Sequence, residues 1–287
     1  MPRRAFIFGL GFTGKRFANA LQAKGFQVSG TTRSGEAMAD IETFAYGPDA
    51  ASLDDLTALD SATHVLLSVP PGADGDPVLS DFGARLAANR NLEWVGYLGT
   101  TGVYGDRDGG EVDETSLLNP SGERGARRVS AEAGWLTLYQ DHGLPLHIFR
   151  LAGIYGPGRN ALAQAKAGTA RRLIKPGHKF SRIHVDDIVQ VLLASMEKPN
   201  PGTAYNVCDD CPSESAEVAL FAAELLALAP PPAIQFADAE LSPMARSFYR
   251  DNKTVSNARI KQELGIKLRY PSYREGLRAL LADYSAG

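Results

Sequence analysis

The sequence holds few of the residues that build disulfide frameworks, metal centres or membrane spans. It has only 2 cysteines and 5 histidines among 287 residues, which excludes a disulfide scaffold and argues against a histidine-rich metal site. No apolar run approaches the roughly 20 residues that a membrane-spanning helix needs. Lysine is missing between Lys24 and Lys166, so a long stretch of the chain carries no primary amine side chain.

The sequence also has no large excess of positive or negative charge. The formal net charge is −3 and the pI is about 6.0, which argues against nucleic acid or an anionic membrane as the main partner. The start Met-Pro-Arg-Arg resembles a signal peptide, but the apolar run after it is short and breaks at Gly9 and Lys15. We therefore interpret this run as the first strand and expect a cytoplasmic protein.

The two cysteines, Cys208 and Cys211, form a Cys-x-x-Cys pattern. Such a pattern occurs in redox pairs and as half of a zinc site. A zinc site needs two more ligands, and no histidine lies near the pair. We expect two ordinary thiols at the end of a strand, and no bound metal.

The apolar residues 6–8 lead into Gly9-x-Gly11-x-x-Gly14. Gly9 permits a tight turn from strand to helix, Gly11 lets a pyrophosphate approach the backbone, and Gly14 lets the helix pack closely on the strand. The amides at the N-terminus of the helix then bind the phosphates. This spacing, placed between a strand and a helix, predicts a dinucleotide-binding site.

Strands and helices alternate through the first half of the chain. Repeated units of this length predict a parallel, doubly wound sheet of the Rossmann type. The predicted strands are 6–8, 26–30, 42–46, 63–69, 93–98 and 144–151, and the predicted helices are 15–21, 52–59, 78–89 and 122–142.

The pattern changes from about residue 156, where Gly and Pro become frequent. A hairpin is predicted over 171–185 with its turn at Pro176-Gly177, and 229–232 is a stiff proline connector. Further helices are predicted at 187–196, 213–228, 256–264 and 273–284. We expect a Rossmann domain over 1–155 and a smaller α+β substrate lobe over 156–287 at the carboxyl edge of the sheet, with some of its segments returning to that sheet.

The end of the second strand favours NADP(H) over NAD(H). NAD-binding versions carry an acidic residue there for the ribose hydroxyl, whereas here nothing acidic occurs before Glu36. Arg33 is able to pair with a 2′-phosphate instead, beside hydroxyl groups such as that of Thr32. The predicted cofactor-binding residues are Gly9, Gly11, Phe12, Thr13, Gly14, Thr32, Arg33, Val69 and Pro70.

Four separate motifs carry a family resemblance. They are Gly99–Gly105 with Val-Tyr-Gly, Arg150–Gly158 with Ile-Tyr-Gly-Pro-Gly, Arg182–Ile188 with Ile-His-Val-Asp-Asp, and Gly202–Val207 with Tyr-Asn-Val. In this order the motifs resemble the extended short-chain dehydrogenase/reductase group, the NAD-dependent epimerase/dehydratase family. The resemblance covers nearly the whole chain.

The resemblance implies transient or permanent oxidation of a substrate hydroxyl, with proton transfer by a Tyr-x-x-x-Lys pair helped by a Ser or Thr hydroxyl. In that pair the lysine cation lowers the phenol pKa, so that the tyrosinate can act as a base. Thr100 is the hydroxyl equivalent. The pair itself is absent from the expected helix, since alignment on Glu132 places Arg124 and Arg128 at the two positions.

Alignment on Asn119-Pro120 instead places Ser121 and Gly125 there, and neither register supplies a lysine. An arginine cannot replace the base, because guanidinium stays protonated at physiological pH. One Tyr-x-x-x-Lys does exist, Tyr249 to Lys253. Because it follows the proline connector, we interpret it as a chance match far from the sheet.

An atypical subgroup of the family, the bacterial YeeZ-type proteins, also lacks the tyrosine and begins this helix with Glu-Arg-Gly. Glu123–Arg128 is similar to that subgroup. Arg124, Arg127 and Arg128 share one helical face by spacing. That face either binds an anionic substrate or is solvated, with Arg128 paired to Glu132.

The remaining candidates for proton donor are Tyr104 and Tyr155, which follow strands at the carboxyl edge of the sheet; both are also candidates for packing residues. The predicted catalytic residues are thus Thr100, Tyr104, Tyr155, Arg124 and Arg128. We expect an NADP(H)-dependent oxidoreductase, monomeric or homodimeric, that acts on a small molecule. The alternatives are a non-catalytic nucleotide-binding sensor or partner-binding module, and a nucleotide-sugar epimerase or dehydratase.

Overall fold

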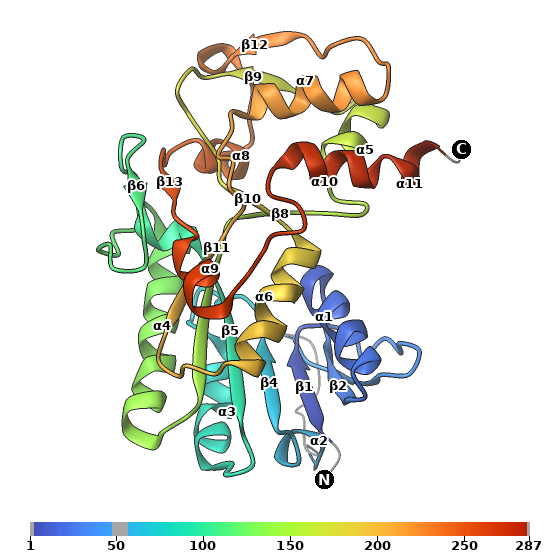
Figure 1. The fold of residues 1–287 in the computed structure, drawn as a ribbon. Helices are drawn as coiled ribbons and strands as arrows, with labels where there is room; N and C mark the ends of the chain where they lie inside the picture. The colour runs from blue at the N-terminus through green and yellow to red at the C-terminus, as the bar shows by residue number, and fades with distance from the viewer. Residues whose placement is uncertain (1–2, 48–56, 286–287) are drawn as a thin grey trace. The chain divides into compact units, whose positions relative to one another are not determined.

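The computed structural model describes residues 3–47 and 57–285, and the chain divides into two compact units (Figure 1). Unit 1 consists of residues 1–100, 126–150 and 189–205, and unit 2 of residues 101–125, 151–188 and 206–287. Each unit is assembled from three separate segments. The expected division at residue 155 into a cofactor domain and a substrate lobe stays a prediction.

The predicted doubly wound sheet is confirmed. Seven strands are ordered β11-β7-β5-β4-β1-β2-β3, and β1–β2, β2–β3, β1–β4 and β4–β5 are parallel pairs. Because β2 and β4 flank β1, the chain reverses direction across the sheet at the strand that carries the glycine motif, where ligands of such sheets bind. The strands are β1 (Arg4–Phe8), β2 (Gln27–Thr32), β3 (Glu42–Ala45), β4 (His64–Leu67), β5 (Trp94–Thr100), β7 (Leu146–Leu151) and β11 (Ala204–Val207).

Helices cover both faces of this sheet. On one face, Phe8, Val65 and Tyr97 pack in a single apolar core with Phe82 and Trp135 of the helices α3 and α4. On the other face, Trp94 contacts Phe17 of α1 and donates a hydrogen bond to Ser195 of α6 at 3.1 Å. The helices are α1 (Phe12–Ala23), α2 (Thr57–Asp60), α3 (Pro77–Ala88), α4 (Glu123–His142) and α6 (Val185–Glu197).

One buried aspartate joins two of these helices. Asp76 caps α3, since its Oδ1 accepts hydrogen bonds from the amides of Val78 and Leu79. Its Oδ2 accepts from Trp135 Nε1 of α4 at 3.0 Å. The cap satisfies amides that the helix start leaves without partners, and the second oxygen fixes α4 beside α3.

Unit 2 has short strands and short helices. Its three two-stranded sheets pair β8 with β10, β9 with β12 and β6 with β13, all in parallel. The strands are β6 (Glu111–Val112), β8 (Gly153–Tyr155), β9 (Arg172–Ile174), β10 (Arg182–His184), β12 (Ala233–Gln235) and β13 (Thr254–Val255). The helices are η1 (Thr101–Tyr104), α5 (Ala161–Lys166), α7 (Ser215–Leu225), η2 (Phe236–Asp238), α8 (Pro243–Phe248), α9 (Ala258–Leu264), α10 (Tyr273–Leu280) and α11 (Ala282–Ser285).

The predicted hairpin over 171–185 is wrong. A turn does form at Pro176-Gly177, where Gly177 has φ +77 and the His178 amide bonds to the Lys175 carbonyl at 3.1 Å. The strands on either side of it, however, pair with distant segments: β9 with β12 and β10 with β8. Local sequence marks a turn, but the partners of the flanking strands are set by tertiary contacts.

Helix bounds differ modestly from the predicted ones. The predicted helix 52–59 is seen as α2 from Thr57, while 52–56 lie outside the described residues. Gly265, with φ +72, ends α9 as expected of a left-handed C-terminal glycine. The predicted helix 273–284 is observed as two helices, α10 and α11.

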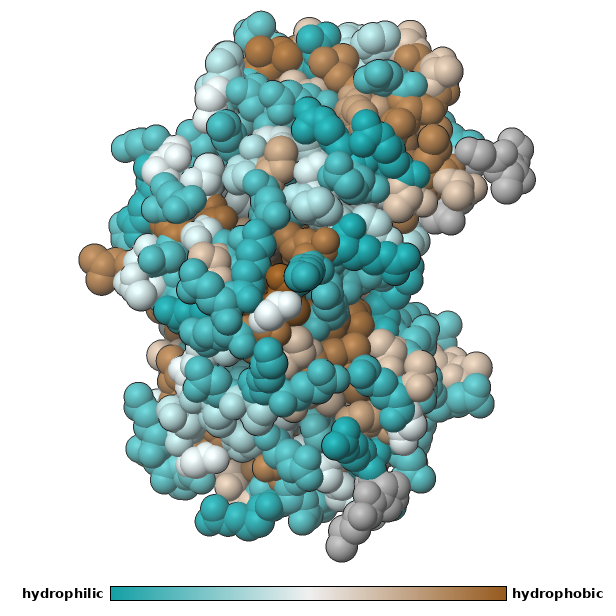
Figure 2. All heavy atoms as spheres, viewed as in Figure 1, coloured by the Kyte–Doolittle hydropathy of each residue, from teal (hydrophilic) through white to brown (hydrophobic). Residues whose placement is uncertain are grey.

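In Figure 2, hydrophilic side chains cover most of the visible surface, with smaller apolar areas between them. Large apolar side chains that are exposed among the described residues are few: Leu117, Leu228 and Phe248. Within the described ranges, no helix is both long and apolar enough to span a bilayer.

Candidate functional site

The turn between β1 and α1 depends on glycine at two positions. Gly9 has φ +92, a conformation that side-chain-bearing residues rarely adopt. Its amide donates to Thr31 Oγ1 at 2.9 Å, which ties the turn to β2. A Cβ on Gly14 would lie 2.3 Å from the Gly9 carbonyl oxygen, so only glycine lets α1 start this close to β1.

The space beside Gly11 fits a dinucleotide phosphate. A Cβ built on Gly11 would meet no atom within 4 Å, and this residue gives the first turn of α1 no side-chain cap. Backbone amides and the helix dipole at such an uncapped start attract anions. Of the neighbouring predicted residues, Thr13 is buried and Phe12 is half-buried.

The other predicted cofactor residues belong to the same unit. Thr32 ends β2, and its hydroxyl is buried with no hydrogen-bond partner among the described residues. Arg33 follows it and is exposed. Val69 lies against the glycine turn, since its Cγ2 would be 3.3 Å from a Cβ on Gly9; Pro70 follows it and is exposed.

Arg128 lies against the carboxyl end of β5, the strand that ends in Thr100. Its Nη1 donates to the Leu98 carbonyl at 2.8 Å and to the Tyr97 hydroxyl at 3.3 Å. Burial raises the pKa of Tyr97 to about 12, so this phenol stays protonated at neutral pH. A fixed positive charge therefore stands at this strand end, in the same unit as the glycine turn.

Glu132 forms an ion pair with Arg150 of β7 rather than with Arg128. Arg150 Nη2 lies 2.9 Å from Glu132 Oε2, and both side chains are buried. The pair fits because Gly99 has no Cβ, which would lie 2.8 Å from Glu132 Oε1. The predicted alternative, a solvated Arg128–Glu132 pair, is therefore not what the structure contains.

The three arginines at the start of α4 do not share one environment. Arg124 is exposed, whereas Arg127 and Arg128 are half-buried. Arg124 belongs to unit 2, where its guanidinium lies 5.7 Å from the ring centroid of Phe248. The shared face that the spacing predicts thus includes residues of both units.

Tyr104 and Tyr155 are buried inside unit 2. The Tyr104 hydroxyl donates to Asn206 Oδ1 at 2.7 Å. Tyr155 contacts the His184 ring edge-on at 5.1 Å, and its hydroxyl donates to the Ser272 carbonyl at 3.4 Å. Burial, followed by the charge of Asp209, raises the pKa of Tyr155, so this residue remains a neutral phenol.

Lys253 contacts the loop that follows Tyr104. Its Nζ donates to the carbonyl of Gly105 at 2.8 Å, although 148 residues separate them. The sequence offers no local signal for this contact, because it arises when β13 pairs with β6. Lys253 is therefore a site candidate, although from the sequence alone we interpret it as part of a chance Tyr-x-x-x-Lys match.

The cysteines of the Cys-x-x-Cys pattern are free thiols. Cys208 is buried and donates to the Val255 carbonyl, and burial raises the pKa of its thiol. Cys211 is half-buried. Within residues 3–47 and 57–285, no group of three or more His, Cys, Asp or Glu is arranged to hold a metal ion.

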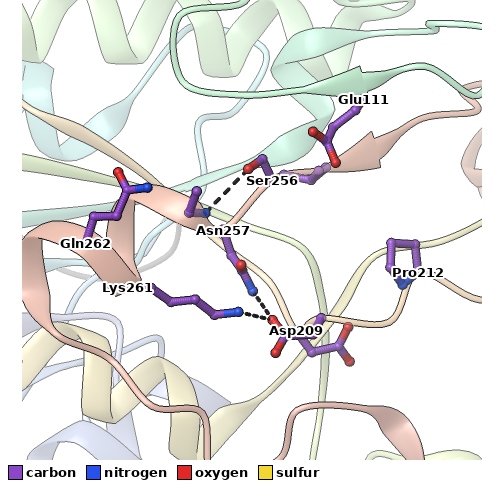
Figure 3. A pocket seen from close by; sticks show the side chains of 10 residues that line it. Glu111, Asp209, Pro212, Ser256, Asn257, Lys261 and Gln262 are labelled. Carbon is purple, nitrogen blue, oxygen red and sulfur yellow. Dashed lines mark hydrogen bonds and ion pairs between the residues drawn. The ribbon is translucent and has the colours of Figure 1, made fainter.

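A cavity of about 420 Å³ also lies within unit 2, and none of the predicted site residues lines it. Asp210 on its wall accepts from Lys261 at 2.5 Å and from Asn257 Nδ2 at 2.6 Å; in Figure 3 a dashed line starts from the side chain of Lys261 and another from that of Asn257. Lys261 and the carboxylate of Asp210, both on the wall of the cavity, thus bind each other.

Two family models match the sequence. The model described as the NAD dependent epimerase/dehydratase family matches residues 84–208, and the model described as NADP oxidoreductase coenzyme F420-dependent matches residues 3–89. The chain is 30% identical to Protein YeeZ of Escherichia coli strain K12, with 94% of this chain and 97% of that protein covered.

Two solved structures are similar to the chain. A conserved protein of unknown function from Silicibacter pomeroyi is 49% identical over 99% of this chain and 100% of the other, with a TM-score of 0.89. The dTDP-glucose 4,6-dehydratase of Bacillus anthracis in complex with NAD shares the fold at 15% identity, with a TM-score of 0.75 over 99% of this chain and 96% of that one. The chain belongs to the NAD-dependent epimerase/dehydratase family and is a homologue of YeeZ.

Proposed function

We propose that the protein is an NADP(H)-dependent oxidoreductase that acts on a small molecule with a carboxylate or phosphate group. The observation that carries the proposal is the position of Arg128. Its guanidinium is held at the carboxyl end of β5 by Leu98 and Tyr97, the edge where ligands of such sheets bind. A permanent cation there suits an anionic substrate and is unable to serve as a base.

The glycine turn supports the cofactor part of the proposal. The open space at Gly11 and the uncapped start of α1 suit a pyrophosphate. When bound, the nicotinamide would supply or accept a hydride. Gly9, Gly14, Phe12, Thr13, Val69 and Pro70 are the proposed neighbours of that cofactor.

The preference for NADP(H) rests on Arg33. This arginine is exposed directly after β2, next to Thr32, and so is available to pair with a 2′-phosphate. We expect Arg33→Ala to weaken NADPH binding about tenfold or more and to leave NADH binding within about twofold, as measured by fluorescence titration. Arg16→Ala serves as a control for general loss of positive charge. Equal affinity of the unchanged protein for NADH and NADPH would contradict the preference.

The proposed chemistry leaves the standard tyrosine–lysine pair out. Thr100 would hydrogen-bond the substrate oxygen, and Tyr104 or Tyr155 would supply the proton. The raised pKa of Tyr155 is compatible with a donor and not with a base near neutral pH. To test for turnover, NADPH is mixed with a panel of anionic carbonyl compounds and nucleotide sugars, and the reduced-nicotinamide absorbance is followed.

A second candidate function is a non-catalytic sensor that binds the dinucleotide only. It is favoured by the burial of both tyrosines and by the Tyr104–Asn206 hydrogen bond, which give each hydroxyl a structural role. Tight NADPH binding without turnover across the panel would favour the sensor. For the arginines, Arg124→Ala with Arg128→Ala should abolish binding of any anionic substrate found, and unchanged binding would contradict their proposed role.

A further inference from the structure

The segment Arg250–Lys253 is fastened to the loop after Tyr104. The Asn252 amide donates to Asp106 Oδ1 at 2.7 Å. The Asn252 carbonyl in turn accepts from the amides of Arg107 and Gly109 at 3.1 and 2.9 Å. The Asn252 backbone thus both donates to and accepts from the loop, which fixes the register of this segment, so the side chains it carries have defined positions.

Lys253 ends this segment with a mostly buried ammonium group. The side chain is 10% exposed, and its Nζ lies 3.4 Å from Asp251 Oδ2. Its other acceptor among the described residues is the Gly105 carbonyl. An ammonium carries three N–H donors, so these two acceptors leave one donor for a ligand. Burial lowers the pKa of Lys253, with Asp251 opposing the shift.

The position of this ammonium relative to Tyr104 is tightly constrained. Gly105 follows Tyr104 and has φ +69. A Cβ there would lie 1.8 Å from the Asn119 carbonyl, so the chain admits only glycine and its carbonyl has little freedom. The Lys253 ammonium is thus held at the carbonyl of Gly105, the residue that follows Tyr104. Tyr104 is one of the tyrosines proposed to contact the substrate.

Two guanidinium groups occur on the same part of unit 2. Arg250 Nη1 donates to the Ser121 carbonyl at 2.7 Å and lies 2.9 Å from the position of a Cβ on Gly122. Arg124 follows Gly122 on α4 and contacts Phe248. The start of α4 and the segment 248–253 therefore contact each other through two arginines, and guanidinium groups bind carboxylate or phosphate.

We propose that Lys253 is a substrate-contacting residue, and that its third N–H donates to the carbonyl oxygen of a substrate whose carboxylate or phosphate is bound by Arg124 and Arg250. This proposal rests on the proposed function, because it takes the anionic substrate from there, and it adds Arg250 to the arginines that the proposed function gives to the anionic group. It also narrows the substrate class to a carbonyl compound that carries an anionic group.

Pyridoxal 5′-phosphate, an aldehyde with a phosphate group, is a suitable probe. A neutral lysine amine attacks its aldehyde carbon, water leaves, and borohydride reduces the imine to a stable secondary amine. The full-length protein is labelled at pH 7 and mapped by mass spectrometry. We expect Lys253 to be modified about tenfold faster than Lys261, a more exposed lysine of α9 that is paired with Asp210. Inorganic phosphate should slow the labelling of Lys253 alone.

Matched variants separate the two parts of the proposal. Arg124→Ala and Arg250→Ala should each reduce labelling of Lys253 about fivefold and leave Lys261 unchanged, while Lys253→Arg should keep the melting temperature and remove the adduct. Labelling of Lys261 without Lys253 would overturn the proposal, and so would a Lys253 adduct that neither phosphate nor the arginine variants reduce. NADPH binding by the unchanged protein is measured in parallel. Absence of NADPH binding would contradict the proposed function, whereas absence of Lys253 labelling with NADPH binding intact would contradict only the proposed contact of Lys253 with substrate.

Discussion

Unit 1 pairs its long strands in one sheet, whereas unit 2 pairs its short strands two at a time. β5 has 7 residues and lies inside a seven-stranded sheet, while β13 has 2 residues and pairs only with β6. Long apolar strands are visible in a sequence because both their faces are buried. Strands of two or three residues lack such a pattern, so whether they form depends on the distant segments that pair with them.

The two units also bury charge differently. In unit 1, the buried Glu132 has a direct partner in Arg150. In unit 2, Asp209 is 2% exposed, and its Oδ2 has no hydrogen-bond partner among the described residues. Burial raises the pKa of both carboxyl groups, and Arg150 opposes the shift at Glu132. Removing the carboxylate leaves a buried cation unpaired in unit 1 but relieves an incompletely paired charge in unit 2. We therefore expect opposite effects of the two mutations on stability.

The largest expected effect is on the buried pair of unit 1. Glu132→Ala leaves the Arg150 guanidinium buried without its carboxylate and should cost about 3–5 kcal/mol of unfolding free energy. Urea unfolding followed by circular dichroism measures it. The control is Glu197→Ala, which breaks an exposed pair with Lys24 and should cost about 0–1 kcal/mol. Similar losses in both variants would contradict the contrast between buried and exposed pairs.

The second prediction concerns the incompletely paired carboxylate of unit 2. Burial raises the pKa of Asp209 to about 7 from 3.8. The folded state therefore holds the proton more tightly, and the stabilisation present below pH 3.8 is lost as the pH rises toward 7. Asp209→Asn removes this loss and should be more stable than the unchanged protein by about 2–4 kcal/mol at pH 8.

The same comparison at pH 4 should give nearly equal stabilities for Asp209→Asn and the unchanged protein, because the carboxyl is then protonated in the folded state. The side-chain oxygen of the Asp209→Asn variant would still accept the Cys211 amide hydrogen bond that Asp209 Oδ1 accepts. A constant difference across the pH range would show that the carboxylate charge is not the cause.

A third prediction concerns unit 1, where the pH dependence of stability at one histidine has the opposite sign. Burial lowers the pKa of His147 to about 4 from 6.5. The folded state then disfavours the proton, so stability present above pH 6.5 is lost as the pH falls toward 4. Between about pH 6.5 and 5 the loss should be about 2 kcal/mol. His147→Gln should remove most of this loss of stability at acid pH. An unchanged loss would show that His147 is not its cause.

The smallest expected effect concerns Tyr104. Tyr104→Phe removes the donor to Asn206 Oδ1 and should cost about 1–2 kcal/mol, since a buried acceptor loses its donor. NADPH affinity should stay within about twofold, because Tyr104 is not among the proposed cofactor-binding residues. If a substrate is found, a fall in kcat larger than the stability loss explains would support the proposed contact of Tyr104 with substrate. Unchanged kcat would favour a packing role.

Much of unit 1 follows from the sequence because its signals are local. Gly9, Gly11 and Gly14 encode a turn within six residues, and β4 and β5 are mostly apolar. The predicted hairpin over 171–185 fails for the opposite reason, since Pro176-Gly177 forms its turn but β9 and β10 find partners elsewhere. Turn chemistry is local, while strand pairing is not.

The candidate site likewise combines features that the sequence predicts with contacts that only the folded chain shows. Arg128 is predictable as a cation at the lysine position, but its contacts with Leu98 and Tyr97 are visible only in the folded chain. The partner of Glu132 is Arg150, a residue of another element, rather than the arginine one helical turn away. A rule for neighbours on a helix is unable to anticipate a buried partner on a strand.

The sequence by itself determined the doubly wound sheet, the dinucleotide turn and the absence of the usual tyrosine–lysine pair, because each is a matter of residue type and short spacing. Tertiary structure alone decided that Lys253 contacts the loop after Tyr104, across 148 positions. The physical reason is that a hydrogen bond between distant residues forms only once β13 and β6 pair, and no local preference of the chain encodes that meeting.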